Sequence, residues 1–178
     1  MIKTGSMAMN SRFGMVSANA TACQDTMAWS LTNVEKNRLG GIGPDSHGEH
    51  VIRYRDIVKV GPIFLDLLVA NSSAYVSHKA RSVNGVQNDV GSIHMSSGNA
   101  VKLRFRLVRG GTNVPFSLPS FTWKVLGLNM GARCGKALVF NNSEVSSFSF
   151  DAQETRITSE VSEDGAFTKF SAPPVYTD

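Results

Sequence analysis

The segment 101–108 constrains the fold more than any other part of the sequence. Apolar side chains occupy every second position, namely Val101, Leu103, Phe105 and Leu107. Basic side chains occupy the positions between them, namely Lys102, Arg104 and Arg106. A period of two sorts side chains onto the opposite faces of a strand, whereas a helix would spread the apolar residues around its circumference. We therefore predict a strand with an apolar face in a core and a basic face in solvent.

A second strand is expected shortly after the first. Gly110 to Asn113 has the composition of a turn and Pro115 follows it. The segment 121–125, Phe-Thr-Trp-Lys-Val, then reads as a strand rich in aromatic and β-branched residues. We predict that the two strands pair and that Leu103, Phe105 and Trp123 lie in the core between two sheets.

Other strand-like segments recur along the chain between turn residues. They cover residues 27–32, 52–58, 63–70, 91–95, 137–140, 145–150, 155–161 and 166–170. In the third of these, Asp66 lies between Phe64 and Leu68 on the face opposite Leu65, which indicates that both faces are covered. For residues 27–32 a helix capped by Asp25 is the alternative. About nine to eleven short strands at this spacing predict an all-β fold, an antiparallel, jelly-roll-like β-sandwich.

The ends of the chain differ from this pattern. Residues 1–25 are small and polar with scattered methionines, and we expect an irregular arm that rests on its own domain or on a partner. Residues 26–172 form the predicted sandwich domain. Pro173 and Pro174 end regular structure, which leaves residues 173–178 as a tail.

Composition narrows the classes of partner and compartment. The formal net charge is only +4 and basic residues do not form runs, which argues against nucleic acid as a partner. No apolar stretch approaches the roughly 18 residues of a transmembrane helix. Cys23 and Cys134 could form one disulfide. Sequons at Asn19, Asn71 and Asn141 fit a secreted protein, and we favour a secreted or organelle-lumenal location over the cytosol.

The order of several motifs resembles a known module. The motifs are Leu39 to Asp45, Ile52 to Tyr54, Leu65 to Val69, Asn84-Gly85, Gly91 to Ile93, Val101 to Phe105 and Leu118 to Phe121. Over about residues 28–170 they resemble a poorly characterised β-sandwich module of algae and related protists, dinoflagellates especially. The module has an acidic Asp-Leu-Asp segment where this chain has Leu126 to Asn129, so no carboxylate site is expected there. The resemblance implies a binding or structural role and a phototrophic protist source.

Catalytic signatures are weak. No Gly-x-Ser-x-Gly motif occurs, and the four histidines are scattered. His47 and His50 flank Glu49 without a third ligand nearby, so we interpret them as an exposed loop and expect no metal and no cofactor. Cys134 lies between Arg133 and Lys136, and such cations favour a reactive thiolate. An enzyme that uses Cys134 is therefore an alternative, but we expect a non-enzyme.

Three functional hypotheses follow from these patterns. The first is a non-catalytic interaction or structural module, an accessory subunit docked on other protein subunits of a larger assembly. The resemblance extends this to a photosynthetic membrane complex of an alga, on which the chain would dock peripherally. The expected partner-binding residues are Arg53, Arg55, Lys102, Arg104 and Arg106. The second hypothesis is a carbohydrate-binding domain with Trp29, Tyr54, Tyr75 and Trp123 as candidate platforms, and the third is the enzyme that uses Cys134.

Overall fold

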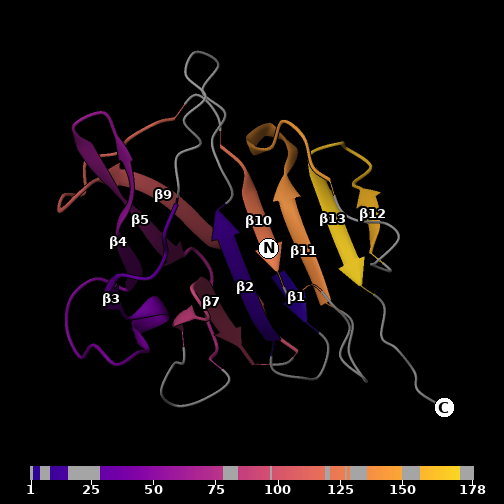
Figure 1. The fold of residues 1–178 in the computed structure, drawn as a ribbon. Coiled ribbons are helices and arrows are strands. Elements are labelled where there is room, and N and C mark those ends of the chain that lie inside the picture. Colours follow the sequence, from indigo (N-terminus) through magenta and orange to yellow (C-terminus); the bar gives the residue numbers. More distant parts are fainter. Residues whose placement is uncertain are drawn as a thin grey trace.

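A computed structural model describes residues 2–4, 9–15, 29–77, 84–96, 98–118, 121–126, 128, 136–149 and 157–172. The described chain is all-β, with thirteen strands, two short 3-10 helices and only antiparallel strand pairs (Figure 1). The first seven strands are β1 (Ile2–Thr4), β2 (Met9–Met15), β3 (Val34–Asn37), β4 (Val51–Val60), β5 (Ile63–Asn71), β6 (Gly85–Gln87) and β7 (Val90–Met95). The others are β8 (Ala100–Val101), β9 (Leu103–Arg109), β10 (Trp123–Leu126), β11 (Lys136–Asn141), β12 (Thr158–Val161) and β13 (Phe167–Ala172). The 3-10 helices are η1 (Leu39–Gly41) and η2 (Asn142–Glu144).

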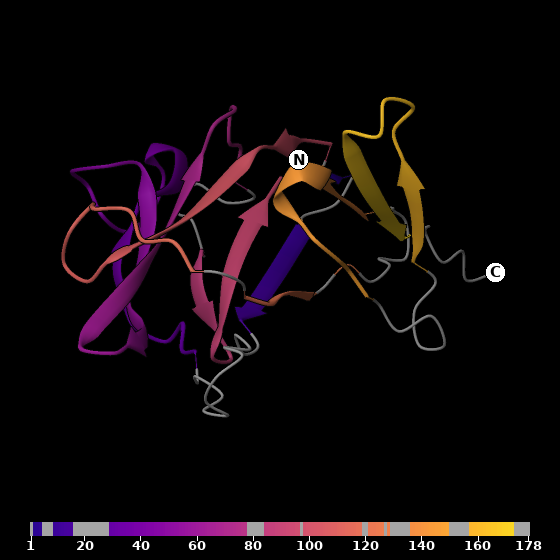
Figure 2. The same ribbon diagram turned by 90° about the horizontal axis from the view of Figure 1, so that it is seen from above.

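The strands form three sheets. Their orders are β3-β4-β5-β9, β10-β2-β7-β6 and β12-β13-β11-β1-β8. Figures 1 and 2 show the sheet of β3, β4, β5 and β9 at one end of the molecule and β12 and β13 at the other. The predicted all-β, antiparallel class is confirmed, with more strands than expected, while the sandwich arrangement stays a prediction.

One hydrophobic cluster joins the three sheets. The alternation of β4 and β5 supplies its centre, and β7, β11 and β13 add further side chains. Its members include Ile52, Tyr54, Leu65, Leu67, Val69, Ile93, Met95, Leu138 and Phe170. The two-residue turn Asn88-Asp89 between β6 and β7 has positive φ at both positions, as a type I′ hairpin turn requires.

β5 is covered on both faces, as the sequence indicated. Leu65, Leu67 and Val69 lie in the core, while Asp66 and Leu68 on the opposite face are also buried. The loop after β9 helps to cover that second face, because the Gly111 N–H donates to Asp66 Oδ2 at 3.0 Å. A carboxylate in the middle of an apolar run thus marks a covered polar site.

The predicted pairing of the strands at 101–108 and 121–125 is wrong. β9 pairs with β5, placing Leu107 opposite Leu67, and β10 pairs with β2. After the turn at 110–113 the chain returns along β9 for only a few residues, with Arg109 N–H donating to Val114 O at 2.9 Å. An isolated bridge joins Val108 to Pro115. Proline has no N–H for a ladder, so this return does not extend into a full strand.

The expected core position of Phe105 is also wrong. Val101 and Leu107 are buried and Leu103 is partly buried, but Phe105 is 40% exposed and Trp123 is only partly buried. Phe105 lies opposite Val69 in the register, so it is on the core side of the sheet. It is exposed because β9 is the end strand of that sheet. Alternation therefore predicted the face of the strand on which Phe105 lies, but not the position of β9 at the edge of its sheet.

Three further segments differ from expectation. Residues 2–4 and 9–15 are strands that pair with their neighbours, so the expected irregular arm is wrong there. Residues 29–33 are not a strand, although Ser30 N–H donates to Ile57 O at 2.8 Å. Residues 145–149 are not a strand either, because no neighbouring strand pairs with them in the described chain. The expected tail, 173–178, lies outside the described residues.

Candidate binding surface

Arg53, one of the predicted partner-binding residues, is part of the fold. Its Nη1 donates to Asp66 Oδ2 at 2.8 Å and to Thr112 O at 3.0 Å, and its Nη2 donates to Asn113 Oδ1. Asp66 is 0% exposed and also accepts the Asp56 N–H at 3.0 Å. The guanidinium therefore ties β4 to β5 and to the loop at 111–113, and it is not available to a partner.

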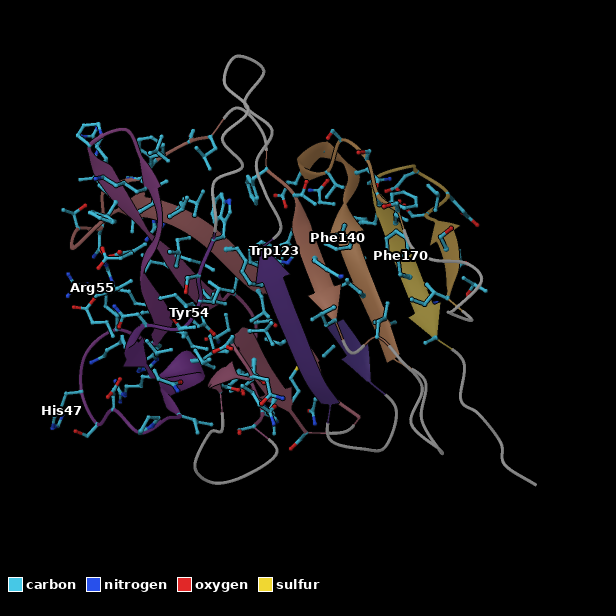
Figure 3. All side chains as sticks on the ribbon, viewed as in Figure 1. His47, Tyr54, Arg55, Trp123, Phe140 and Phe170 are labelled. Carbon is cyan, nitrogen blue, oxygen red and sulfur yellow. The ribbon has the colours of Figure 1, made fainter. Side chains whose placement is uncertain are left out.

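Arg55 is only partly available. Its Nη1 lies 3.6 Å from Glu35 Oε1, while Glu35 Oε2 lies 3.7 Å from Arg53 Nε. Glu35 is shared between the two arginines, so the local charge is partly neutralised. Figure 3 labels Arg55 at the end of the molecule away from Phe140 and Phe170.

The other three predicted residues form an exposed basic stripe. Lys102 precedes β9, and Arg104 and Arg106 lie on it. Arg104 is opposite Ala70 and Arg106 is opposite Leu68, so both arginines share the outer face of the sheet. The ion pairs between described residues involve none of the three. All three residues are exposed and therefore accessible from solvent.

A row of four aromatic rings lies beside this stripe, and the sequence analysis did not predict it. Ring centroids are 6.0 Å apart for Trp29 and Phe121, 6.5 Å for Phe121 and Trp123, and 4.7 Å for Trp123 and Phe105. Phe105 and Phe121 are 40% and 46% exposed. The Trp29 Nε1–H is buried and has no hydrogen-bond partner in the described chain. Two of the four rings are therefore exposed, and Trp29 adds a buried N–H donor for which the described residues offer no acceptor.

The aromatic row joins the margins of two sheets. β9 and β10 are the end strands of their sheets, and the contact between Phe105 and Trp123 connects them. Lys124 follows Trp123 and is exposed, as Arg104 and Arg106 are on either side of Phe105. Because side chains alternate along a strand, these cations lie on the opposite faces of β9 and β10 from Phe105 and Trp123, so the rings and the cations come together only along the edges of the two strands. Figure 3 shows Trp123 near the middle of the molecule.

We call this region the aromatic-basic surface. It comprises Trp29, Phe105, Phe121, Trp123, Lys102, Arg104, Arg106 and Lys124. Aromatic residues and arginines are enriched where proteins bind one another. Finding the surface from sequence would have required the sheet order, because the rings come from three separate segments.

A buried serine–histidine pair was also missed by the sequence analysis. Ser92 Oγ and His94 Nε2 are 2.8 Å apart on one face of β7. A hydroxyl beside an imidazole is the arrangement of an activated nucleophile. Here Ser92 is fully buried, so a substrate carbonyl cannot reach it. The backbone N–H of His94 donates to Asn84 Oδ1 at 2.8 Å, and the Tyr75 hydroxyl donates to the same oxygen at 3.1 Å. The pair belongs to a buried hydrogen-bond network.

Tyr54 reaches the backbone next to Asn84 of this network. Its hydroxyl donates to Gly85 O at 2.8 Å, and burial raises the pKa of the Tyr54 phenol well above its usual range. Tyr54 and Tyr75 are both buried, so neither can be a sugar platform. Trp29 and Trp123 remain candidates for that role.

The remaining predicted sites carry no further chemistry in the described residues. His47 and His50 lie in an exposed loop, and no group of three metal-ligating side chains gathers in the part of the chain described. Cys23 and Cys134 lie outside the described residues. No described helix has the length and apolar character needed to cross a membrane.

Comparison with known proteins assigns no family. No protein-family model, no curated protein and no solved structure matches this chain. The resemblance to the algal β-sandwich module therefore stays a prediction that rests on motif order alone.

Proposed function

We propose that the chain is a non-catalytic interaction module, an accessory subunit that docks on a larger protein assembly through the aromatic-basic surface. The observation that carries the proposal is the row of aromatic rings at the margins of two sheets, two of them exposed, near cations that form no ion pair with any described residue. An isolated exposed apolar residue is ordinary, but a contiguous exposed patch marks a contact site.

The exposed rings are large enough to contribute to binding. An aromatic side chain has roughly 200 Å² of surface, and Phe105 and Phe121 expose 40% and 46% of theirs. Covering roughly 80–90 Å² per ring at about 25 cal/mol per Å² gives about 2 kcal/mol for each ring. Two such rings near the centre of an interface are typical of binding hot spots.

The cations define the chemistry of the partner. Lys102, Arg104, Arg106 and Lys124 complement acidic groups that surround an apolar patch. Such complementarity accelerates association and excludes basic partners. If the resemblance to the algal module holds, the assembly is a photosynthetic membrane complex and the docking is peripheral.

The proposal is tested with charge-matched variants in a native extract of the source organism. The full chain should elute from a sizing column within a larger assembly. Arg104→Glu combined with Arg106→Glu should return it to the position of the free chain without changing its melting temperature. Lys59→Glu combined with Lys169→Glu makes the same change in net charge elsewhere and should leave the assembly intact. Equal loss of assembly in both double variants would indicate that only net charge matters.

Carbohydrate binding is the second candidate function. The linked rings of Trp29, Phe121 and Trp123 favour it, because sugars stack on exposed aromatic faces. A glycan array separates the two readings: binding of the full chain that Phe121→Ala abolishes would support the carbohydrate, whereas an array without any binder at millimolar concentration would exclude it.

A further inference from the structure

A hollow lies on a different sheet from those that carry the aromatic-basic surface. It has a volume of about 440 Å³ and is built on β11, β12 and β13, with the segment from η2 to Phe148 as its wall. We call it the Phe148 pocket. Pockets for small ligands typically have volumes of about 300–1,000 Å³, so the hollow is large enough for one.

Strand register forms the floor of this pocket. Val161 is opposite Thr168, and Thr168 is opposite Phe140, so the three side chains make one row across the sheet. Phe170 lies two residues beyond Thr168 on the same face. Figure 3 shows Phe140 and Phe170 side by side at the end of the molecule away from Arg55. The floor is thus held by backbone pairing on both sides of β13.

Three phenylalanine rings give the pocket its aromatic lining. Phe170 contacts Phe140 with a centroid distance of 5.9 Å and Phe148 with one of 4.7 Å, at interplanar angles of 71° and 76°. Phe148 and Val161 are 53% and 58% exposed. The lining therefore presents apolar surface to water rather than sealing it inside the core.

The polar groups that line the pocket are uncharged, and some of them already form hydrogen bonds within the protein. Thr168 Oγ1 donates to Asn142 Oδ1 at 2.7 Å, and Asn142 Nδ2 donates to Gly165 O at 2.8 Å. Ser146 and Ser147 are exposed in the wall. None of the described lining residues carries a charge. A charged ligand would lose hydration here without an opposite charge to replace it.

We propose that the Phe148 pocket binds a small, uncharged, mainly apolar molecule with at most a few hydroxyl or carbonyl groups. The aromatic floor and wall contact its apolar body, and the serine hydroxyls of the wall meet its polar end. This site is separate from the proposed docking surface, and its test does not depend on a protein partner.

The test uses 1-N-phenylnaphthylamine, an uncharged apolar fluorophore, with the full chain. The fluorescence titration should saturate at one probe per chain. Phe148→Ala, which removes the ring in the wall, should weaken binding by at least about fivefold. Val161→Trp, which replaces a side chain of the floor with a much larger one, should weaken it as well. Circular dichroism spectra that match the unchanged chain show that the variants are folded.

Phe167→Ala is the matched control. Phe167 lies on the same strand as Phe170 and is 44% exposed, close to the 53% of Phe148, but it alternates with Thr168 and faces away from the pocket. Its removal should leave the probe affinity unchanged. The proposal is overturned by non-saturable binding, by folded Phe148→Ala and Val161→Trp variants that bind as before, or by equal losses in Phe148→Ala and Phe167→Ala. Tighter binding of 1-anilinonaphthalene-8-sulfonate would overturn the uncharged class of ligand.

Discussion

Replacing Arg53 with methionine should destabilise the free chain strongly. Methionine keeps a long apolar stem but removes the guanidinium from Asp66, whose carboxylate is 0% exposed. The backbone N–H groups of Asp56 and Gly111, both at 3.0 Å, then remain as donors to the carboxylate. Removing one partner of a buried ion pair costs about 3–5 kcal/mol. The two remaining donors place the expected loss near the lower end, at about 3 kcal/mol.

Urea unfolding followed by tryptophan fluorescence measures this loss. Lys169→Met is the matched control, because it breaks the exposed pair in which Lys169 Nζ lies 3.3 Å from Glu160 Oε2. An exposed pair is worth about 0–1 kcal/mol. The double variant Arg53→Met with Asp66→Leu should recover part of the stability, since no charge is then left buried. If Arg53→Met costs no more than Lys169→Met, the structural role given to Arg53 is refuted.

Three further predictions concern single positions. Phe105→Ala should lower the free energy of unfolding by about 1–2 kcal/mol, less than the 3–5 kcal/mol of a core phenylalanine, because the ring is 40% exposed; urea unfolding checks this value. Burial raises the pKa of Tyr54, so the stability that its neutral phenol contributes is complete below the pKa of about 10 in the unfolded chain and is lost as the pH rises beyond it. Melting temperatures should therefore fall more steeply above pH 10 for the unchanged chain than for Tyr54→Phe. Gly43→Ala should lower the free energy of unfolding by about 1–3 kcal/mol, and with it the melting temperature, because a Cβ there would lie 2.0 Å from Asn37 O. An unchanged melting temperature would mean that the loop moves freely.

Local patterns predicted much of the fold. The alternation in β5 predicted the face that lies in the core, and the position of Asp66 in an apolar run indicated a second covered face. Periodicity also predicted the outer face of Arg104 and Arg106. These features depend only on which side of a strand each residue takes, which sequence spacing determines directly.

Features that depend on sheet order were not predictable in the same way. Adjacent strands in sequence often pair, yet β9 pairs with the earlier β5 and β10 pairs with β2. That order places Phe105 at a margin and brings it to Trp123. The contact of Arg53 with Asp66, in contrast, lies between the consecutive strands β4 and β5. The strand β2 did carry a signal, because Met9, Ser11, Phe13 and Met15 alternate with polar or small residues, but its polar neighbourhood concealed the pattern.

The most direct test of the docking surface uses the two tryptophans of the chain. Trp29 and Trp123 both belong to the aromatic-basic surface, and no other tryptophan occurs in the sequence. The full chain labelled with 5-fluorotryptophan gives two fluorine resonances that an unlabelled partner does not obscure. On addition of an assembly fraction that retains the chain on a sizing column, both resonances should shift or broaden. Retention in the assembly with both resonances unchanged would show that docking occurs elsewhere.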